Sequence, residues 1–235
     1  MLSNAILSAI AAFIAHSKFA EAAALGKGAG SMPEDSLTTR LRLADSVVDR
    51  YGLLPEDKDF VYDFNSSETG FADSKSFPAL VGTGLSFASA PLPGCHMVMV
   101  HLHPRSAELF AVVSGRIYTE GTAEAGVVDS QGKPRVIKTE LSAGQATVFY
   151  QGTMHYQINP DCEPAQAVAA FSSEDAGTSA AAASLLSLGD EAVSRAFGQS
   201  IAGEDVDKIR HSIPATAAVK VDECLAKCGK QKRRA

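Results

Sequence analysis

The chain has 235 residues, 46% of them hydrophobic and 20% charged, with a formal net charge of −6. These values exclude a disordered or collagen-like chain and allow a substantial apolar core. The negative charge argues against a general nucleic-acid binder, because neutralising phosphates requires a basic face. Basic residues cluster only in the carboxy-terminal tail, interpreted as a solvated end rather than a partner-binding patch: Lys227, Lys230, Lys232, Arg233 and Arg234.

An apolar run lies within the first 25 residues, MLSNAILSAIAAFIAHSKFAEAAAL. The run is too short to span a bilayer, and it is followed by small residues that suit signal peptidase. We therefore predict a secretory signal over residues 1–25 and an extracellular protein, with the cell wall as one destination. A buried or amphipathic helix is the alternative, because only the α-amino group supplies positive charge before Lys18. No other stretch is expected to cross a membrane.

Residues 26–58 are expected to form a linker and a helix that precede the main domain. The stretch GKGAGSMPED is typical of a flexible linker, and Ser36 is suited to cap the helix that follows. Residues at helical spacing predict that this helix continues to about residue 51: Leu37, Leu41, Ala44, Val48 and Tyr51.

The segment from residue 59 to residue 175 has the pattern of strands. Short apolar or alternating runs such as HMVMVHLH, ELFAVVSGRIYTE, ATVFY and AQAVAAFSS are separated by glycine, proline, aspartate and asparagine. This pattern predicts an all-β domain, either a barrel or a sandwich. Residues 176–235 are richer in alanine, leucine and serine, which predicts a helical extension with helices near 188–198 and 203–212 before the basic tail.

The cysteines of the chain are Cys95, Cys162, Cys224 and Cys228. An even number in a secreted chain favours disulfides over free thiols. A bond between Cys224 and Cys228 would be strained, because both residues would lie on one face of a helical tail. We therefore expect a disulfide between distant segments, made by one of these two residues or by Cys95 with Cys162.

Three histidines and one glutamate are placed to meet inside the strand domain. His101 and His103 are two residues apart, so both side chains point to one face if HMVMVHLH is a strand. Glu108 follows in the next strand, and His155 begins a later strand after a turn at Gly152. Burying these side chains without a partner would be costly, and a cation would satisfy them together. The spacing therefore predicts a metal site.

Two stretches resemble the signature motifs of the cupin superfamily, GCHMVMVHLHPRSAELFAVVSG and GQATVFYQGTMHYQIN. Within that superfamily, HLHPR and SSEDAGT resemble germins and the spherulin-like proteins of fungi and slime moulds. The resemblance extends from about Asp59 into the carboxy-terminal helices. It implies an all-β fold, a single cupin jelly-roll β-barrel with an amino-terminal helix and a carboxy-terminal helical extension. It also implies that His101, His103, Glu108 and His155 are the metal ligands and the catalytic centre.

The resemblance to germins favours Mn2+, although Fe, Zn, Ni and Cu also accept three imidazoles and one carboxylate. It implies a manganese-dependent oxidoreductase that acts on a small molecule or on superoxide. Germin oxalate oxidases resemble one another in presenting two asparagines to the substrate, and here Val98 and Ala88 hold those positions. Without these donors the outer oxygens of oxalate stay unpaired, so superoxide dismutation is the preferred activity. Tyr150 replaces a proline of the second motif, which alters a turn and no ligand.

Two other functions are kept as alternatives. A non-enzymatic spherulin-like protein of the cell wall, spore or stress response would use the metal for stability or ligand binding, and a closed pocket would favour that role. A carbohydrate or small-molecule binder is less favoured, because the chain has no tryptophan to stack on sugars. The expected pocket is mostly apolar, with walls formed by Met97, Met99, Phe110, Phe149 or Tyr150, and Tyr156.

Self-association is expected if apolar residues occupy both faces of the strands. Val98, Val100 and Leu102 would lie opposite the ligand face and would contact water unless helices cover them. Germins form dimers that assemble into hexamers, so the resemblance implies a homo-oligomer that is at least a dimer.

Overall fold

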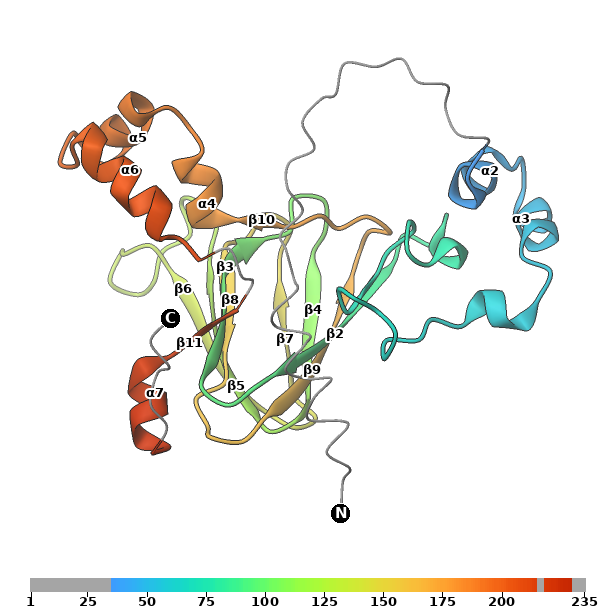
Figure 1. Ribbon diagram of the computed structural model, residues 1–235, viewed down its shortest axis with the longest axis horizontal. Helices are drawn as coiled ribbons and strands as arrows, with labels where there is room; N and C mark the ends of the chain where they lie inside the picture. The colour runs from blue at the N-terminus through green and yellow to red at the C-terminus, as the bar shows by residue number, and fades with distance from the viewer. Residues whose placement is uncertain (1–34, 215–217, 230–235) are drawn as a thin grey trace.

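Two antiparallel sheets enclose the core of the protein, as Figure 1 shows. The computed structural model describes residues 35–214 and 218–229. The first sheet has the spatial order β1-β2-β9-β4-β7, formed by Phe71–Ala72, Ser86–Leu92, Ala165–Phe171, Glu108–Ser114 and Ala146–Phe149. The second has the order β10-β3-β8-β5-β6, formed by Ser179–Ala180, His96–Leu102, His155–Ile158, Arg116–Thr122 and Val136–Ser142. Strand β11 (Ala218–Lys220) also pairs with β3.

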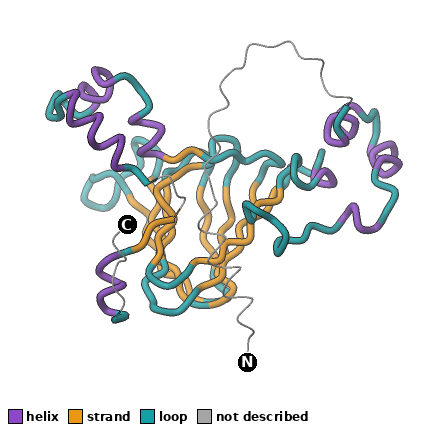
Figure 2. Tube along the Cα trace, in the orientation of Figure 1, coloured by secondary structure: helices purple, strands orange, loops and turns teal. Residues whose placement is uncertain are grey.

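The chain crosses from one sheet to the other at most connections, for example from β3 to β4 and from β7 to β8. This connectivity is that of a jelly roll. Together with helices that lie outside the barrel on two sides (Figure 2), it confirms the predicted fold class. The end of β3 and the start of β8 lie at the same end of the barrel, because His101 pairs with His155 in the β3–β8 register. The start of β4 lies there too, since the Glu108 carboxylate is 3.0 Å from the His155 imidazole.

The core is formed by strand residues that alternate between the inside and the outside of the barrel. In β9, every second residue of AQAVAAF is buried, as expected for a strand with one face inside. Gly115, between β4 and β5, has a φ of 78°, and a Cβ at this position would lie 2.8 Å from the Cβ of Ala165. Glycine is therefore needed where the chain crosses between the sheets. The core residues are Leu92, Phe110, Val112, Ile117, Leu141, Phe149, Ala165, Ala167, Ala169, Phe171 and Ala176.

The segment that precedes the barrel forms two helices, where one continuous helix was predicted. They are α2 (Leu37–Leu43) and α3 (Val47–Leu53), and Ser36 caps the first as expected. The prediction of one continuous helix to residue 51 is wrong, because Ala44 is extended and the Ser46 hydroxyl accepts a hydrogen bond from the Asp49 amide, which starts a new helix. Short 3-10 helices follow at Asp57–Phe60 and Pro78–Leu80.

The carboxy-terminal extension contains α4 (Ala181–Leu186), α5 (Asp190–Ala196), α6 (Gly203–Ser212) and α7 (Asp222–Lys227). Helices α5 and α6 lie where the composition predicted them. A separate small core is formed by Leu186 of α4, Val193 of α5 and Val206 of α6, which are all buried. Within the predicted helical extension, the short strands β10 and β11 and the bounds of the helices α4 and α7 were not predicted, because two to six residues carry too little periodicity to recognise.

Two disulfides fix α7 to the barrel, Cys95–Cys224 and Cys162–Cys228. The prediction that one of Cys224 and Cys228 bonds to a distant segment is confirmed, and both of them do so. The alternative bond between Cys95 and Cys162 is wrong. Strand β11 pairs with β3, and this brings Cys224 and Cys228 close to the loops that contain Cys95 and Cys162.

Among the residues that the structure describes, no helix combines the length and the apolar character needed to cross a membrane. The predicted signal at residues 1–25 and most of the basic tail, residues 230–235, lie outside the described residues. Lys227 is exposed at the end of α7.

Candidate metal centre

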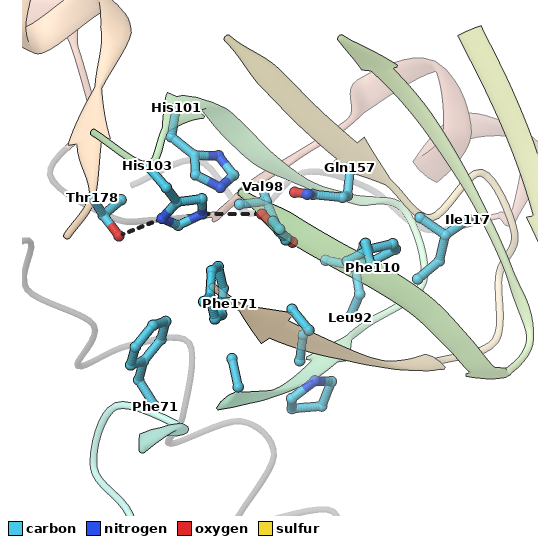
Figure 3. A pocket seen from close by; sticks show the side chains of 15 residues that line it. Phe71, Leu92, Val98, His101, His103, Phe110, Ile117, Gln157, Phe171 and Thr178 are labelled. Atoms are coloured by element: carbon cyan, nitrogen blue, oxygen red, sulfur yellow. Dashed lines mark hydrogen bonds and ion pairs between the residues drawn. The ribbon is translucent and has the colours of Figure 1, made fainter. Parts of the chain in front are cut away.

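Three histidines and one glutamate meet at one end of the barrel. His101 is near the end of β3, His103 directly follows that strand, Glu108 begins β4 and His155 begins β8. All four side chains are buried, and one donor atom from each lies within 4.8 Å of the others. Figure 3 shows His101 and His103 directed into the same cavity. The structure thus brings together the four residues selected from the sequence, as a group that can hold a metal ion.

The glutamate lies at the centre of this group. Glu108 Oε2 is 3.0 Å from Nε2 of His103 and 3.0 Å from Nε2 of His155. The rings of His101 and His155 are also close, with centroids 4.3 Å apart. The other two histidines of the described chain, His96 and His211, take no part in the group.

Backbone carbonyls orient each of the three imidazoles. The Nδ1 atoms of His101, His103 and His155 lie 2.8, 2.6 and 2.8 Å from the carbonyl oxygens of Met99, Gly177 and Thr153. A carbonyl only accepts, so each Nδ1 must donate, and in a neutral ring the lone pair then resides on Nε2. Lone pairs facing a carboxylate need a proton or a cation between them. The donor set therefore fits a divalent transition metal.

Burial and neighbouring charges set the protonation of the group. Burial, together with the positive charge of a protonated His155, lowers the pKa of His101 to about 4. Burial raises the pKa of Glu108, but hydrogen bonds from His103 and His155 outweigh that effect and hold it at about 2. At neutral pH, His101 is neutral and Glu108 is ionised, which are the forms that bind a metal.

A loop after β9 supports His103 from outside the barrel. Arg105 donates from Nε to the carbonyl of Asp175 at 2.9 Å and pairs through Nη2 with the Asp175 carboxylate at 2.6 Å. This clamp holds the loop that presents the Gly177 carbonyl to His103. The stretch GQATVFYQGTMHYQIN also contacts His103, because the Gly152 amide donates a hydrogen bond to the His103 carbonyl at 3.0 Å.

Aromatic rings pack against two of the imidazoles. Phe149 stacks on His155 with centroids 4.0 Å apart and planes 12° apart, and Phe171 meets His103 edge-on at 4.7 Å. Sequence reasoning placed Phe149 or Tyr150 in the pocket wall, but Phe149 supports a histidine instead and Tyr150 is 72% exposed. Neighbouring residues of an extended chain face opposite sides, so Phe149 at the end of β7 points inward and Tyr150 in the following turn points to solvent.

A cavity of about 190 Å³ adjoins the cluster, and its wall is mostly apolar as predicted. Val98 and Ala88, which replace the asparagines expected from the germin resemblance, both line it, as does Phe110. The expectation that Val98 lies opposite the ligand face is wrong, because a register shift between Val98 and His101 turns both inward.

Three other residues predicted for the pocket do not line it. Met97 and Tyr156 alternate with inward-facing neighbours on β3 and β8, and Met99 lies within the irregular stretch of β3. Sequence reasoning assigned no role to Gln157 and Thr178, which do line the cavity. The position of Gln157 two residues after His155 does place it on the same face of that strand, as the sequence indicates, but no function was attached to it.

The fold and the site define a cupin, a β-barrel with a buried group of three histidines and one glutamate. The sequence model of the cupin family matches residues 52–206, and the chain belongs to this family. Spherulin-1A from Physarum polycephalum is 33% identical over 210 residues, which cover 85% of this chain and 81% of that protein.

Two further similarities agree with this family. Germin-like protein 2-4 from Oryza sativa subsp. japonica is 37% identical over 140 residues, which cover 57% of this chain and 58% of that protein. A solved structure of a recombinant oxalate oxidase in complex with glycolate superposes with a TM-score of 0.56 and 19% identity, over 66% of this chain and 81% of that one. At this identity the structural likeness shows the fold alone.

Proposed function

We propose that the protein is a secreted manganese-binding cupin that dismutes superoxide, with His101, His103, Glu108 and His155 as both metal ligands and catalytic centre. The observation that carries this proposal is the convergence of four buried donors beside a cavity. A bound manganese ion would supply one-electron chemistry through its Mn(II)/Mn(III) couple. Resemblance to germins supports manganese over Fe, Zn, Ni and Cu.

The protein side chains contribute position and charge to this chemistry. Among the described residues that line the cavity there is no lysine, serine or cysteine, and the hydroxyl of Thr178 lies 3.5 Å from Nδ1 of His103, on the side of that ring away from Glu108. The carbonyl contacts at Nδ1 keep each Nε2 directed at the metal position, and Glu108 is the one carboxylate among the described residues of the wall. Superoxide is small and needs no recognition by the wall, which suits an apolar cavity.

Oxalate is a poorer fit than superoxide. Val98 and Ala88 present methyl groups where a dicarboxylate would need hydrogen-bond donors. Buried carboxylate oxygens without donors lose the hydrogen bonds that they make in water, so binding is disfavoured.

A non-enzymatic role is the second candidate. The similarity to spherulin-1A, which covers 85% of the chain, supports it. In this role the metal would stabilise the barrel without turnover. Metal-dependent stability without superoxide dismutation by the metal-loaded protein would favour this candidate.

The test uses the purified full chain loaded with manganese. Superoxide dismutation should be lost in His103→Ala together with bound manganese. His211→Ala is the matched control, since this histidine is exposed on α6 and far from the donor group in sequence. Equal activity in His103→Ala and the wild type would rule out the metal centre as the source of activity.

Two further expectations belong to this proposal. The two disulfides support export, because such bonds persist in oxidising compartments, and we propose residues 1–25 as the secretory signal.

We also propose a homo-oligomer. Its interface would be the outer face of the first sheet, where an exposed apolar row crosses neighbouring strands: Phe87, Leu109 and Val148. Leu109→Lys should yield a monomer by light scattering, and an unchanged mass would exclude this interface.

A further inference from the structure

The two disulfides that hold α7 lie against each other. Helix α7 follows β11 on the outside of the barrel, as Figure 1 shows, and its two cysteines bond to Cys95 and Cys162. The Sγ atom of Cys95 lies 3.4 Å from the Sγ atom of Cys228, although these residues belong to different disulfides. No other atom fits between two sulfur atoms at this distance. The sulfurs of Cys95, Cys224 and Cys228 therefore form one group, within 4.8 Å of one another.

The two bonds differ in their access to solvent. Cys95 is fully buried and Cys224 is 7% exposed, so the bond between them is shielded from a reductant in solution. Cys162 and Cys228 are half-buried, and Cys162 lies in the loop between β8 and β9, where the two residues that follow are exposed. The rate of thiol–disulfide exchange depends on access. A dissolved thiol therefore meets the Cys162–Cys228 bond first.

We propose that Cys162 is a modification site for low-molecular-weight thiols of the glutathione class. When the thiol adds to Cys162, the buried bond changes from Cys95–Cys224 to Cys95–Cys228. Helix α7 stays bonded to the barrel throughout, because one of its two cysteines is joined to Cys95 before and after the exchange. This keeps β11 beside β3, the strand that contains His101. Neither metal binding nor superoxide dismutation is required for this chemistry.

The reaction consists of two exchange steps. A thiolate RS⁻ attacks the Cys162 sulfur, forms the mixed disulfide between Cys162 and R, and releases Cys228 as a thiolate. The Cys228 thiolate attacks the adjacent Cys95 sulfur, forms the Cys95–Cys228 disulfide and releases Cys224. Cys224 takes up the proton that the attacking thiol lost. One thiol is consumed and one is formed, so no external oxidant or reductant is required.

The released Cys224 thiol has hydrogen-bond acceptors at its position in the structure. Its sulfur lies 3.2 Å from the carbonyl oxygen of Pro160 and 3.8 Å from that of Asp161. A carbonyl oxygen accepts a hydrogen bond from an S–H group, whereas a disulfide sulfur has no hydrogen to donate. These carbonyls therefore stabilise Cys224 as a protonated thiol, which favours the exchanged state.

The exchange also determines which sulfur keeps the added thiol. If the thiol adds to Cys228, the released Cys162 thiolate remains beside the new bond and expels the added group. If the thiol adds to Cys162, the capture of Cys228 by Cys95 removes the thiolate that would reverse the reaction. The adduct at Cys162 therefore persists.

Peptide mapping of the oxidised full chain tests this proposal. The protein is incubated with reduced glutathione, and acid and N-ethylmaleimide then stop the exchange and block free thiols. Trypsin cleaves after Lys227 and so separates Cys224 from Cys228. Mass spectrometry should find glutathione on Cys162, a Cys95–Cys228 disulfide and the maleimide on Cys224. An intact Cys95–Cys224 disulfide with the maleimide on Cys228 would overturn the proposal.

Two serine variants separate exchange from independent reduction of each bond. Cys162→Ser leaves Cys228 as a thiol beside Cys95, so part of this variant should contain the Cys95–Cys228 disulfide without any added thiol. Cys228→Ser is the matched control, because it removes the exchanging sulfur and keeps Cys95–Cys224. In this control, glutathione should expose Cys224 to the maleimide at least about tenfold more slowly than in the wild type. An equal rate would show that the buried bond is reduced directly, and the mapping of the wild type requires neither variant to fold.

Discussion

His155 Nε2 lies 3.0 Å from Glu108 Oε2 at the end of the barrel, although 47 positions separate the two residues in the chain. Jelly-roll connectivity produces this contact, because β4 and β8 belong to different sheets and begin at the same end. The metal centre therefore depends on packing between the sheets as well as on the ligands themselves.

Truncation of the ring that supports His155 should destabilise the barrel. Phe149 is 4% exposed and stacks on this imidazole, so Phe149→Ala leaves a cavity and should cost about 3–5 kcal/mol of unfolding free energy. Urea denaturation of the metal-free protein measures the change. Tyr150→Ala is the control at the neighbouring position, since its side chain is 72% exposed. Equal losses in both variants would contradict the packing described for Phe149.

The clamp between Arg105 and Asp175 should affect metal affinity more than stability. Both side chains are more than half exposed, so their ion pair contributes at most about 1 kcal/mol. Its loss in Arg105→Ala frees the loop that presents the Gly177 carbonyl to His103, and manganese affinity should fall about tenfold or more. Equilibrium dialysis measures this affinity. Unchanged binding would show that the loop holds its place without the clamp.

The metal-free protein should lose stability as the pH falls from about 6.5 to about 4. The ordinary histidine pKa is 6.5, and burial lowers that of His101 to about 4 in the folded state. The unfolded chain therefore takes up a proton at His101 first, so the stabilising contribution is complete above pH 6.5 and disappears through this window. Urea midpoints at several pH values measure the slope. His101→Gln should flatten it, and an equal slope in that variant would assign the effect to other groups.

The sequence predicted the barrel and the donor group because both depend on short-range patterns. His101 and His103 share a strand face by period two, and glycine and proline mark the strand ends. Irregular backbone was harder to predict. The register shift before His101 turns Val98 inward, and no residue type in HMVMVHLH signals it.

Long-range pairing accounts for the remaining differences. Strand β11 has three residues, and its partner β3 lies more than a hundred positions earlier, so neither composition nor period indicated the return of the chain. The disulfide partners of Cys224 and Cys228 depend on this return of the chain, so the sequence did not identify them. At Ser46, by contrast, the sequence did contain a signal, because a serine followed three residues later by aspartate is typical of a helix start.

The most direct test of the metal centre is elemental analysis of the purified full chain, before and after incubation with manganese and dialysis. The geometry predicts about one transition-metal ion for each chain in the wild type and none in Glu108→Gln, with His211→Ala equal to the wild type. A folded wild-type protein that contains no transition metal and takes up none would contradict it.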